Sequence, residues 1–184
     1  MLFNDHWELE GRHAFLSPSQ HYWLNYTPEK LETTFLNTKA RERGIKLHQL
    51  ASDCIKMGVK LARNKNTLNQ FVNDAIGFKM ESEQPLYYSE YCFGTADAIS
   101  FKKNVLRIFD LKTGAMPVSM NQLKVYAALF CLEYSIRPAD IEHIELRIYQ
   151  SNEVLLEEGD PDEIQSIMDL IVDFDHQLNL LDQD

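Results

Sequence analysis

The sequence predicts an α/β fold in which a mixed β-sheet is flanked by helices. Apolar residues recur at helical spacing up to about residue 80, and the pattern then changes to short segments rich in Tyr, Phe, Ile and Val. A later passage of strand, helix and strand adds parallel pairing to an antiparallel hairpin, which makes the sheet mixed. Because the 184-residue chain has no repeat or long linker, it is expected to form a single domain over residues 1–184.

The amino-terminal part, residues 1–80, is expected to be helical. Ser17-Pro18-Ser19 and Thr27-Pro28-Glu29 are helix-start signals, because they combine a capping hydroxyl with a proline in the first turn. Apolar residues at helical spacing predict one helix from about Ile45 to Ala62 and another over about 66–78.

Residues 85–150 are expected to form the sheet and one helix packed on it. The predicted elements, in order, are strands at about 86–93, 95–101 and 105–112, a helix at 119–135 and a strand at about 143–150. The second and third strands form a hairpin, in which Phe93, Phe101 and Leu111 are among the residues that make both faces apolar. An acidic helix over 160–182 follows, with a start signal at Asp160-Pro161-Asp162-Glu163.

Composition limits the class of protein. The chain is 45% hydrophobic and 25% charged, which is ordinary for a soluble globular protein. No apolar run approaches the roughly 20 residues of a membrane span, and the first residues lack a basic leader and an apolar signal core, so a cytoplasmic protein without a membrane partner is expected. The three cysteines, Cys54, Cys92 and Cys131, have no metal-ligand spacing, so no iron–sulfur cluster is expected.

The net charge of −10 is unevenly distributed. Residues from Glu153 to Asp184 include eleven acids and no Lys or Arg, whereas residues 39–65 include eight basic residues and two acids. The acidic helix is interpreted as a solvated outer face. The basic run has two open interpretations, a solvated helical face or a surface that contacts phosphates of a nucleic acid.

Two acids and a lysine, Asp97, Asp110 and Lys112, stand in a hairpin whose two faces are largely apolar. If Lys103-Asn104 is a two-residue turn, paired positions sum to 207, so Asp97 and Asp110 oppose each other with β carbons about 4.5–5.5 Å apart. Opposed carboxylates repel unless a cation lies between them, and oxygen ligands suit Mg²⁺ or Mn²⁺. Lys112 points to the same face. The alternative is a set of surface charges that Lys112 neutralises. Glu90, on the preceding strand, could reach such a cation, although a surface position at the hairpin edge is favoured.

These residues resemble the signature of PD-(D/E)XK nucleases, most closely the RecB-like branch and related phage-encoded exonucleases. The matching motifs are the Asp of Gly94-Thr95-Ala96-Asp97, the Asp-x-Lys-Thr-Gly of residues 110–114, Gln122 and Tyr126 four residues apart, and His48 after Gly44. The resemblance covers about residues 44–150 and implies a restriction-endonuclease-like core.

The resemblance also implies roles for these residues. Asp97, Asp110, His48 and the backbone carbonyl of Leu111 would be ligands of Mg²⁺ or Mn²⁺. Lys112 would orient or help activate the attacking water and stabilise charge on the phosphate. Gln122 and Tyr126, on one face of a helix, would support the lysine, the nucleophile or the DNA backbone. Contacts to the DNA backbone are expected from four basic residues: Arg41, Arg43, Lys46 and Lys124.

The expected function is therefore metal-dependent hydrolysis of DNA, as an exonuclease in recombination, repair or phage replication. The partner is DNA, with a recombination protein or a helicase as a separate chain, in the cytoplasm of a bacterium or of a phage-infected host. Two alternatives stay open: a catalytically weak DNA-binding or recombination-partner module of the same fold, and a structural or interaction protein whose acidic end is the working part.

Overall fold

The computed structural model describes residues 5–182, and the chain divides into two compact units, Met1–Arg43 and Gly44–Asp184. The first unit contains two 3₁₀ helices, η1 (Trp7–Leu9) and η2 (Pro18–Asn25), and the beginning of helix α1 (Pro28–Met57). The hydroxyl of Thr27 accepts a hydrogen bond from the backbone of Lys30 at 3.2 Å, which caps α1 as the sequence predicts. That residues 1–184 form a single functional domain stays a prediction.

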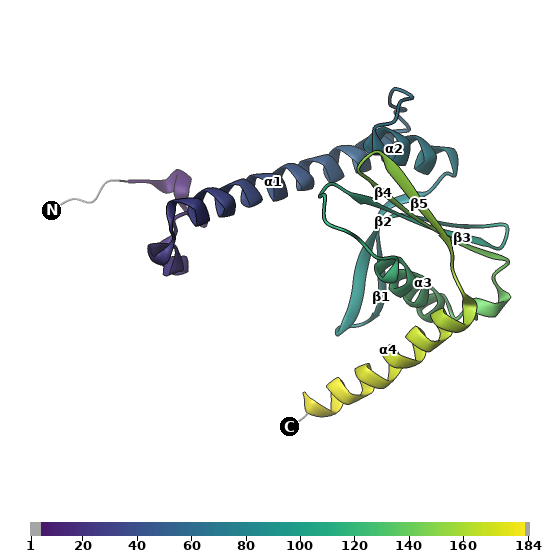
Figure 1. The fold of residues 1–184 in the computed structure, drawn as a ribbon. Coiled ribbons are helices and arrows are strands. Elements are labelled where there is room, and N and C mark those ends of the chain that lie inside the picture. The colour runs from purple at the N-terminus through teal and green to yellow at the C-terminus, as the bar shows by residue number, and fades with distance from the viewer. Residues whose placement is uncertain (1–4, 183–184) are drawn as a thin grey trace. The chain divides into compact units, whose positions relative to one another are not determined.

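The second unit is a five-stranded sheet with helices on both faces (Figure 1). Its elements after α1 are α2 (Thr67–Gly77), β1 (Glu81–Ser89), β2 (Cys92–Lys102), β3 (Val105–Lys112), α3 (Asn121–Tyr134), η3 (Pro138–Asp140), β4 (His143–Gln150), β5 (Glu153–Glu158) and α4 (Pro161–Leu181). The strand order is β1-β2-β3-β4-β5, and only the β3–β4 pair is parallel within this described sheet. The predicted α/β fold with a mixed sheet is confirmed.

The β2–β3 hairpin has the predicted register. Lys103 and Asn104 have φ angles of 51° and 61°, so they form a two-residue turn of the type whose twist suits a hairpin. The pairs run from Lys102 with Val105 to Ala98 with Phe109, and each sums to 207. The turn therefore fixes which residues of β3 lie opposite β2.

Several predicted elements differ from the observed ones. The turn before β2 lies at Glu90 and Tyr91, not at Gly94, which is inside β2. Helix α1 ends at Met57 rather than near Ala62, because Gly58 takes a positive φ of 68° that stops the helix. Strand β5 was not predicted, since its apolar residues do not alternate with polar ones and most of the strand is exposed.

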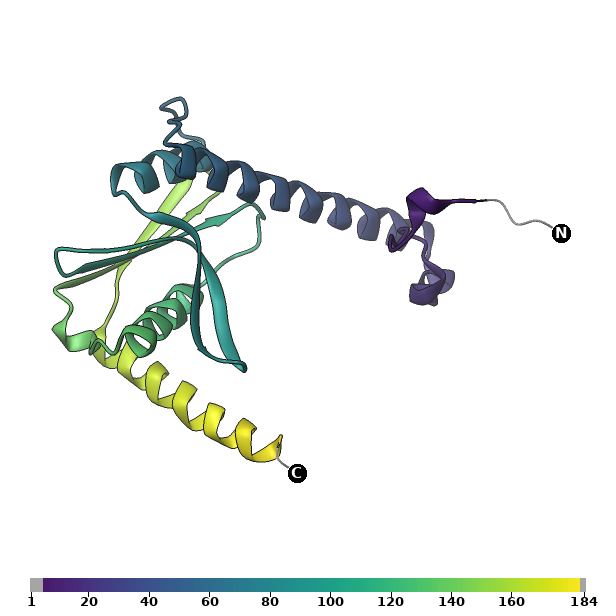
Figure 2. The same ribbon diagram turned by 180° about the vertical axis from the view of Figure 1, so that it is seen from behind.

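The central strand β3 separates two apolar layers. Leu106 and Ile108 pack with residues of α3 and α4, whereas Phe109 and Leu111 pack with α2 and the end of α1. Figure 2 shows the two groups of helices from behind. In this arrangement the carboxyl end of β3, with Asp110 and Lys112, lies between the two layers. None of the helices in the described part of the chain combines the length and the apolar character that crossing a membrane demands.

Candidate functional site

Three side chains from three elements form a potential cation-binding group. His48 of α1, Glu83 of β1 and Asp97 of β2 each offer one ligand atom, and these atoms all lie within 4.8 Å of one another. His48 Nδ1 is 3.3 Å from Asp97 Oδ2. The structure thus brings together His48 and Asp97, as predicted, and adds Glu83.

The helix that carries His48 approaches β3 closely because it contains Gly44. A β carbon on Gly44 would lie 2.7 Å from the Thr113 hydroxyl oxygen, which is too close for any side chain at this position. Thr113 directly follows Lys112. The glycine one turn before His48 therefore allows α1 to pack against the end of β3, next to the candidate site.

Glu83 is the residue that sequence reasoning missed. It lies opposite Asp97, between the pairs Ser82–Ala98 and Gln84–Ala96, and has a φ of 52°. Such a left-handed backbone is uncommon for a residue other than glycine and carries strain. Two signals were missing. A turn at Glu90 and Tyr91 pairs Ser89 with Cys92 and would by itself oppose Gln84 to Asp97, and a register shift between Tyr87 and Ser89 moves the pairing by one residue, so that Glu83 lies opposite Asp97. Glu90 itself lies in that turn and is not part of the group.

Asp97 occupies a break in the hydrogen-bond ladder of the sheet. The pairing of β2 with β3 stops at Ala98 and Phe109, so Asp97 and Asp110 are not one of its pairs. Instead, Asp97 Oδ2 accepts a hydrogen bond of 2.9 Å from the backbone N–H of Leu111. This bond keeps the carboxylate beside the end of β3 while the strands separate. The Leu111 side chain is buried in the layer with α2.

A second group connects β3 with α3 and β2. Lys112 Nζ donates to Asp110 Oδ1 at 3.1 Å and to Gln122 Oε1 at 2.7 Å. Gln122 Nε2 lies 3.4 Å from the Tyr126 hydroxyl, which donates to the Thr95 carbonyl oxygen at 2.7 Å. Because two of the three ammonium protons are used, one remains for a substrate oxygen. The four predicted residues Asp110, Lys112, Gln122 and Tyr126 therefore form one chain of contacts.

Gly94 has a packing role rather than the predicted turn role. A β carbon there would lie 3.0 Å from Tyr126 Cε1, so the absence of a side chain makes room for the tyrosine ring. The ring can then reach across β2 to Thr95. Gly94 thus helps to position Tyr126, the last residue in the chain of contacts that begins at Asp110.

Electrostatics favours a cation at the site. Burial raises the pKa of Asp110, and the neighbouring Asp97 raises it further, although Lys112 opposes the shift. Partial burial and Asp97 likewise raise the pKa of Glu83, and the contact with Asp97 raises the pKa of His48. The carboxylates therefore repel one another, and a divalent ion would relieve this repulsion.

A donor set of carboxylate oxygens with one imidazole fits a divalent cation such as Mn²⁺ or Mg²⁺. Asp110 Oδ2 is one further potential ligand atom. Asp110 Oδ2 lies 2.9 Å from Lys112 Nζ as an ion pair, yet it is buried and accepts no hydrogen bond from a described residue. Its lone pairs are available to a cation. The identity of the ion is not determined by these residues.

Replacing Asp97 with asparagine is expected to weaken Mn²⁺ binding by at least about tenfold. Asp97 is central to the group, and the change removes its charge while keeping its shape. Titration of free Mn²⁺ by electron paramagnetic resonance measures the affinity. Glu90→Gln is the matched control, because it removes the same charge from the nearby exposed turn. Equal affinities of the two variants would show that Asp97 holds no cation.

The residues predicted to contact DNA lie on two helices. Arg41, Arg43 and Lys46 are on α1, where Lys46 is two residues before His48. Lys124 lies 2.8 Å from Glu157 and 2.9 Å from Glu163, and its side chain is only 12% exposed. The structure therefore gives Lys124 a role in joining α3 to β5 and α4, and its contact with DNA stays a prediction.

Comparison with known proteins gives one match. The family described as "Protein of unknown function (DUF2800)" matches residues 67–165, more than half of the 184-residue chain. This range contains Glu83, Asp97 and the chain of contacts from Asp110 to Tyr126, while His48 precedes it. No curated protein and no solved structure matches the chain.

Proposed function

We propose that this chain, which belongs to the DUF2800 family of proteins of unknown function, is a divalent-metal-dependent nuclease that hydrolyses phosphodiester bonds in DNA. The observation that carries the proposal is the position of Lys112. Its ammonium group is fixed by Asp110 and Gln122, in the same unit as a carboxylate–imidazole group suited to a cation. Phosphoryl transfer needs this combination, because negative charge on the phosphate must be offset by positive groups held in place before the reaction.

Each residue then has a definite task. His48, Glu83, Asp97 and Asp110 would hold the cation, which would polarise an attacking water and offset charge on the phosphate. Lys112 uses its remaining proton to hold a phosphate oxygen or the water. Gln122 and Tyr126 keep the lysine in place, because the tyrosine anchors α3 to Thr95 through a 2.7 Å hydrogen bond.

The order of motifs supports the same proposal. A His on an early helix, an Asp, an Asp-x-Lys and a Gln–Tyr pair occur in the order typical of the RecB-like branch of PD-(D/E)XK nucleases. A mixed sheet flanked by helices is compatible with that superfamily. We extend the proposal to an exonuclease in DNA recombination, repair or phage replication, with any helicase supplied by another chain.

Incubation with end-labelled single- and double-stranded DNA tests this function. Cleavage is expected with Mg²⁺ or Mn²⁺, and none with EDTA or with the Asp110→Ala variant, because that change removes both a potential ligand and the partner of Lys112. The pattern of labelled products also distinguishes exonuclease from endonuclease action. Binding of DNA without metal-dependent cleavage would contradict the proposal and favour a DNA-binding module of the same fold.

A further inference from the structure

The loop between α1 and α2, residues 58–66, is fixed by amide side chains of α2. Asn73 makes two hydrogen bonds to the backbone of Leu61, as acceptor at 2.8 Å and as donor at 3.0 Å. Asn69 donates to the Ala62 carbonyl at 2.9 Å, and Gln70 donates to the Lys65 carbonyl at 3.0 Å. A loop without regular structure is therefore attached at three points and has a defined shape.

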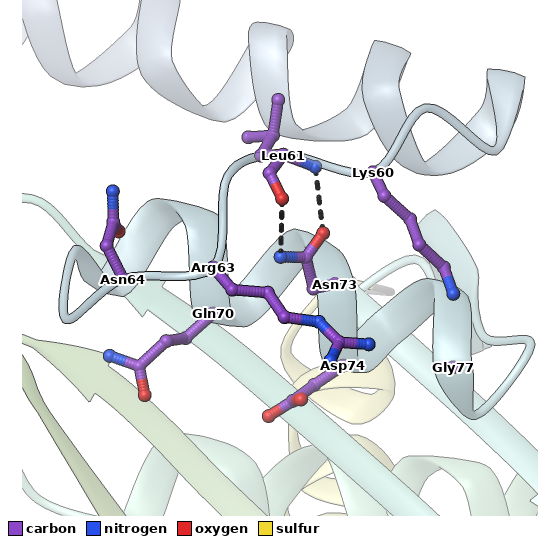
Figure 3. Close-up of a pocket in the computed structure, with 8 residues that line it drawn as sticks. All are labelled: Lys60, Leu61, Arg63, Asn64, Gln70, Asn73, Asp74 and Gly77. Atoms are coloured by element: carbon purple, nitrogen blue, oxygen red, sulfur yellow. Dashed lines mark hydrogen bonds between the residues drawn. The ribbon is translucent and has the colours of Figure 1, made fainter.

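This loop and α2 enclose a polar pocket of about 380 Å³ (Figure 3). Lys60 and Arg63 line it, together with the amide groups of Asn64 and Gln70. Most ligand pockets are lined predominantly by apolar side chains. Of the eight residues that line this one, six have polar or charged side chains, whose aliphatic parts also face the pocket. The lining suits a charged ligand that accepts hydrogen bonds.

The pocket carries a net positive charge. Its acid is Asp74, whose Oδ2 already accepts a hydrogen bond of 2.8 Å from the Tyr149 hydroxyl and lies 3.3 Å from Arg147. Among the described residues, Lys60 and Arg63 take part in none of the ion pairs formed by Lys or Arg. The two cations of the loop are thus available to an external anion.

From this geometry we infer that the pocket, defined by Lys60, Arg63, Asn64 and Gln70, binds a backbone phosphate of a DNA strand. A polyanion is favoured over a small anion, because the chain is rich in cations on both sides of the two lining residues, with Lys46 and Lys56 before them and Lys65 after them in the sequence. The inference rests on the proposed function, since it assigns a second contact with the same substrate.

The pocket is separate from the candidate site. Its lining residues all follow the end of α1 at Met57, whereas His48 lies nine residues before that end. The lining includes neither the residues of the cation group nor Lys112 and its partners. A phosphate held there is therefore expected to contribute to affinity rather than to the chemical step.

Fluorescence anisotropy with a labelled single strand of about 20 nucleotides, the full chain and EDTA tests this inference over a series of salt concentrations. Arg63→Gln is expected to weaken binding about three- to tenfold and to reduce the slope of log K against log salt by about 0.7, because one phosphate contact is lost. The matched control is Lys103→Asn, which removes one positive charge from the β2–β3 turn and keeps a residue that tolerates its φ of 51°. Equal effects of the two changes would overturn the inference.

A second variant tests the anchored loop itself. Asn73→Ala removes both hydrogen bonds to Leu61 and leaves every charge in place, so affinity is expected to fall while the salt slope is retained. Unchanged affinity in this variant would overturn the role of the loop. Cleavage of the same strand with Mg²⁺ separates the two proposals. If the unaltered protein cleaves the strand but Arg63→Gln binds DNA like the control variant, the pocket is rejected and the nuclease is not. If Arg63→Gln reduces the slope of log K against log salt but the unaltered protein does not cleave, the nuclease is rejected and the pocket is not.

Discussion

Replacing Lys112 with alanine is expected to lower the rate of DNA cleavage by about 10²–10³-fold, the usual cost of removing one donor that stabilises a transition state. The ammonium group is held 2.7 Å from Gln122 and 2.9 Å from Asp110, so its position is fixed before a substrate binds. The side chain is 29% exposed, which leaves it accessible to a substrate. The effect should fall on the chemical step, because the lysine is not among the residues that line the pocket proposed to bind DNA.

Single-turnover cleavage of end-labelled DNA measures this change. Circular dichroism establishes that the variant is folded, which matters because Asp110 loses its buried partner. Lys103→Asn serves again as the control for loss of one positive charge. A Lys112→Ala variant that cleaves at the rate of the unaltered protein would reject the assignment of Lys112.

Replacing Phe109 with alanine is expected to lower the free energy of unfolding by about 3–5 kcal/mol. The residue is 0% exposed, and its ring centroid lies 5.8 Å from that of Phe78 and 5.7 Å from that of Tyr149. The guanidinium of Arg147 is 4.8 Å from the same centroid. Removal of the ring would leave a cavity between β3 and the layer of α2.

Equilibrium unfolding in urea measures this loss. Phe93→Ala is a matched control in the same hairpin, because Phe93 is 67% exposed and contacts Tyr87 by stacking at 6.4 Å. Its change is expected to stay within about 0.5 kcal/mol. This exposure also corrects the expectation that Phe93 belongs to an apolar hairpin face. Equal losses for the two variants would show that the layer around Phe109 contributes little to stability.

The hairpin shows what local sequence can predict. A two-residue turn at Lys103-Asn104 leaves one antiparallel register, and the alternation of side chains then determines the face of each residue. The same reasoning placed Asp110 and Lys112 on one face, where they form an ion pair. It failed at Asp97, because the ladder ends one pair earlier and the carboxylate bonds to Leu111 instead.

The β1–β2 turn shows where local reasoning fails. A glycine in a segment of mixed polarity indicates a turn, yet Gly94 lies inside β2. The position lacks a side chain because the ring of Tyr126 occupies the space next to it. The misplaced turn directed attention to Glu90 and away from Glu83. Only contact between α3 and β2, which are far apart in the sequence, reveals the reason for the glycine.

The α/β class and the register of the β2–β3 hairpin follow from the sequence alone, because they depend on local periodicity and one turn. The residues from Asp110 to Tyr126 are indicated by their resemblance to a nuclease signature, and the contacts among them depend on how α3 packs on the sheet. The tertiary structure decided that Glu83 joins His48 and Asp97, and that Lys124 pairs with acids of β5 and α4. Such groups come from separate elements, and their distances depend on how helices and strands pack. The close approach of Gly44 to Thr113 is an example, since no local pattern predicts which atoms will meet there.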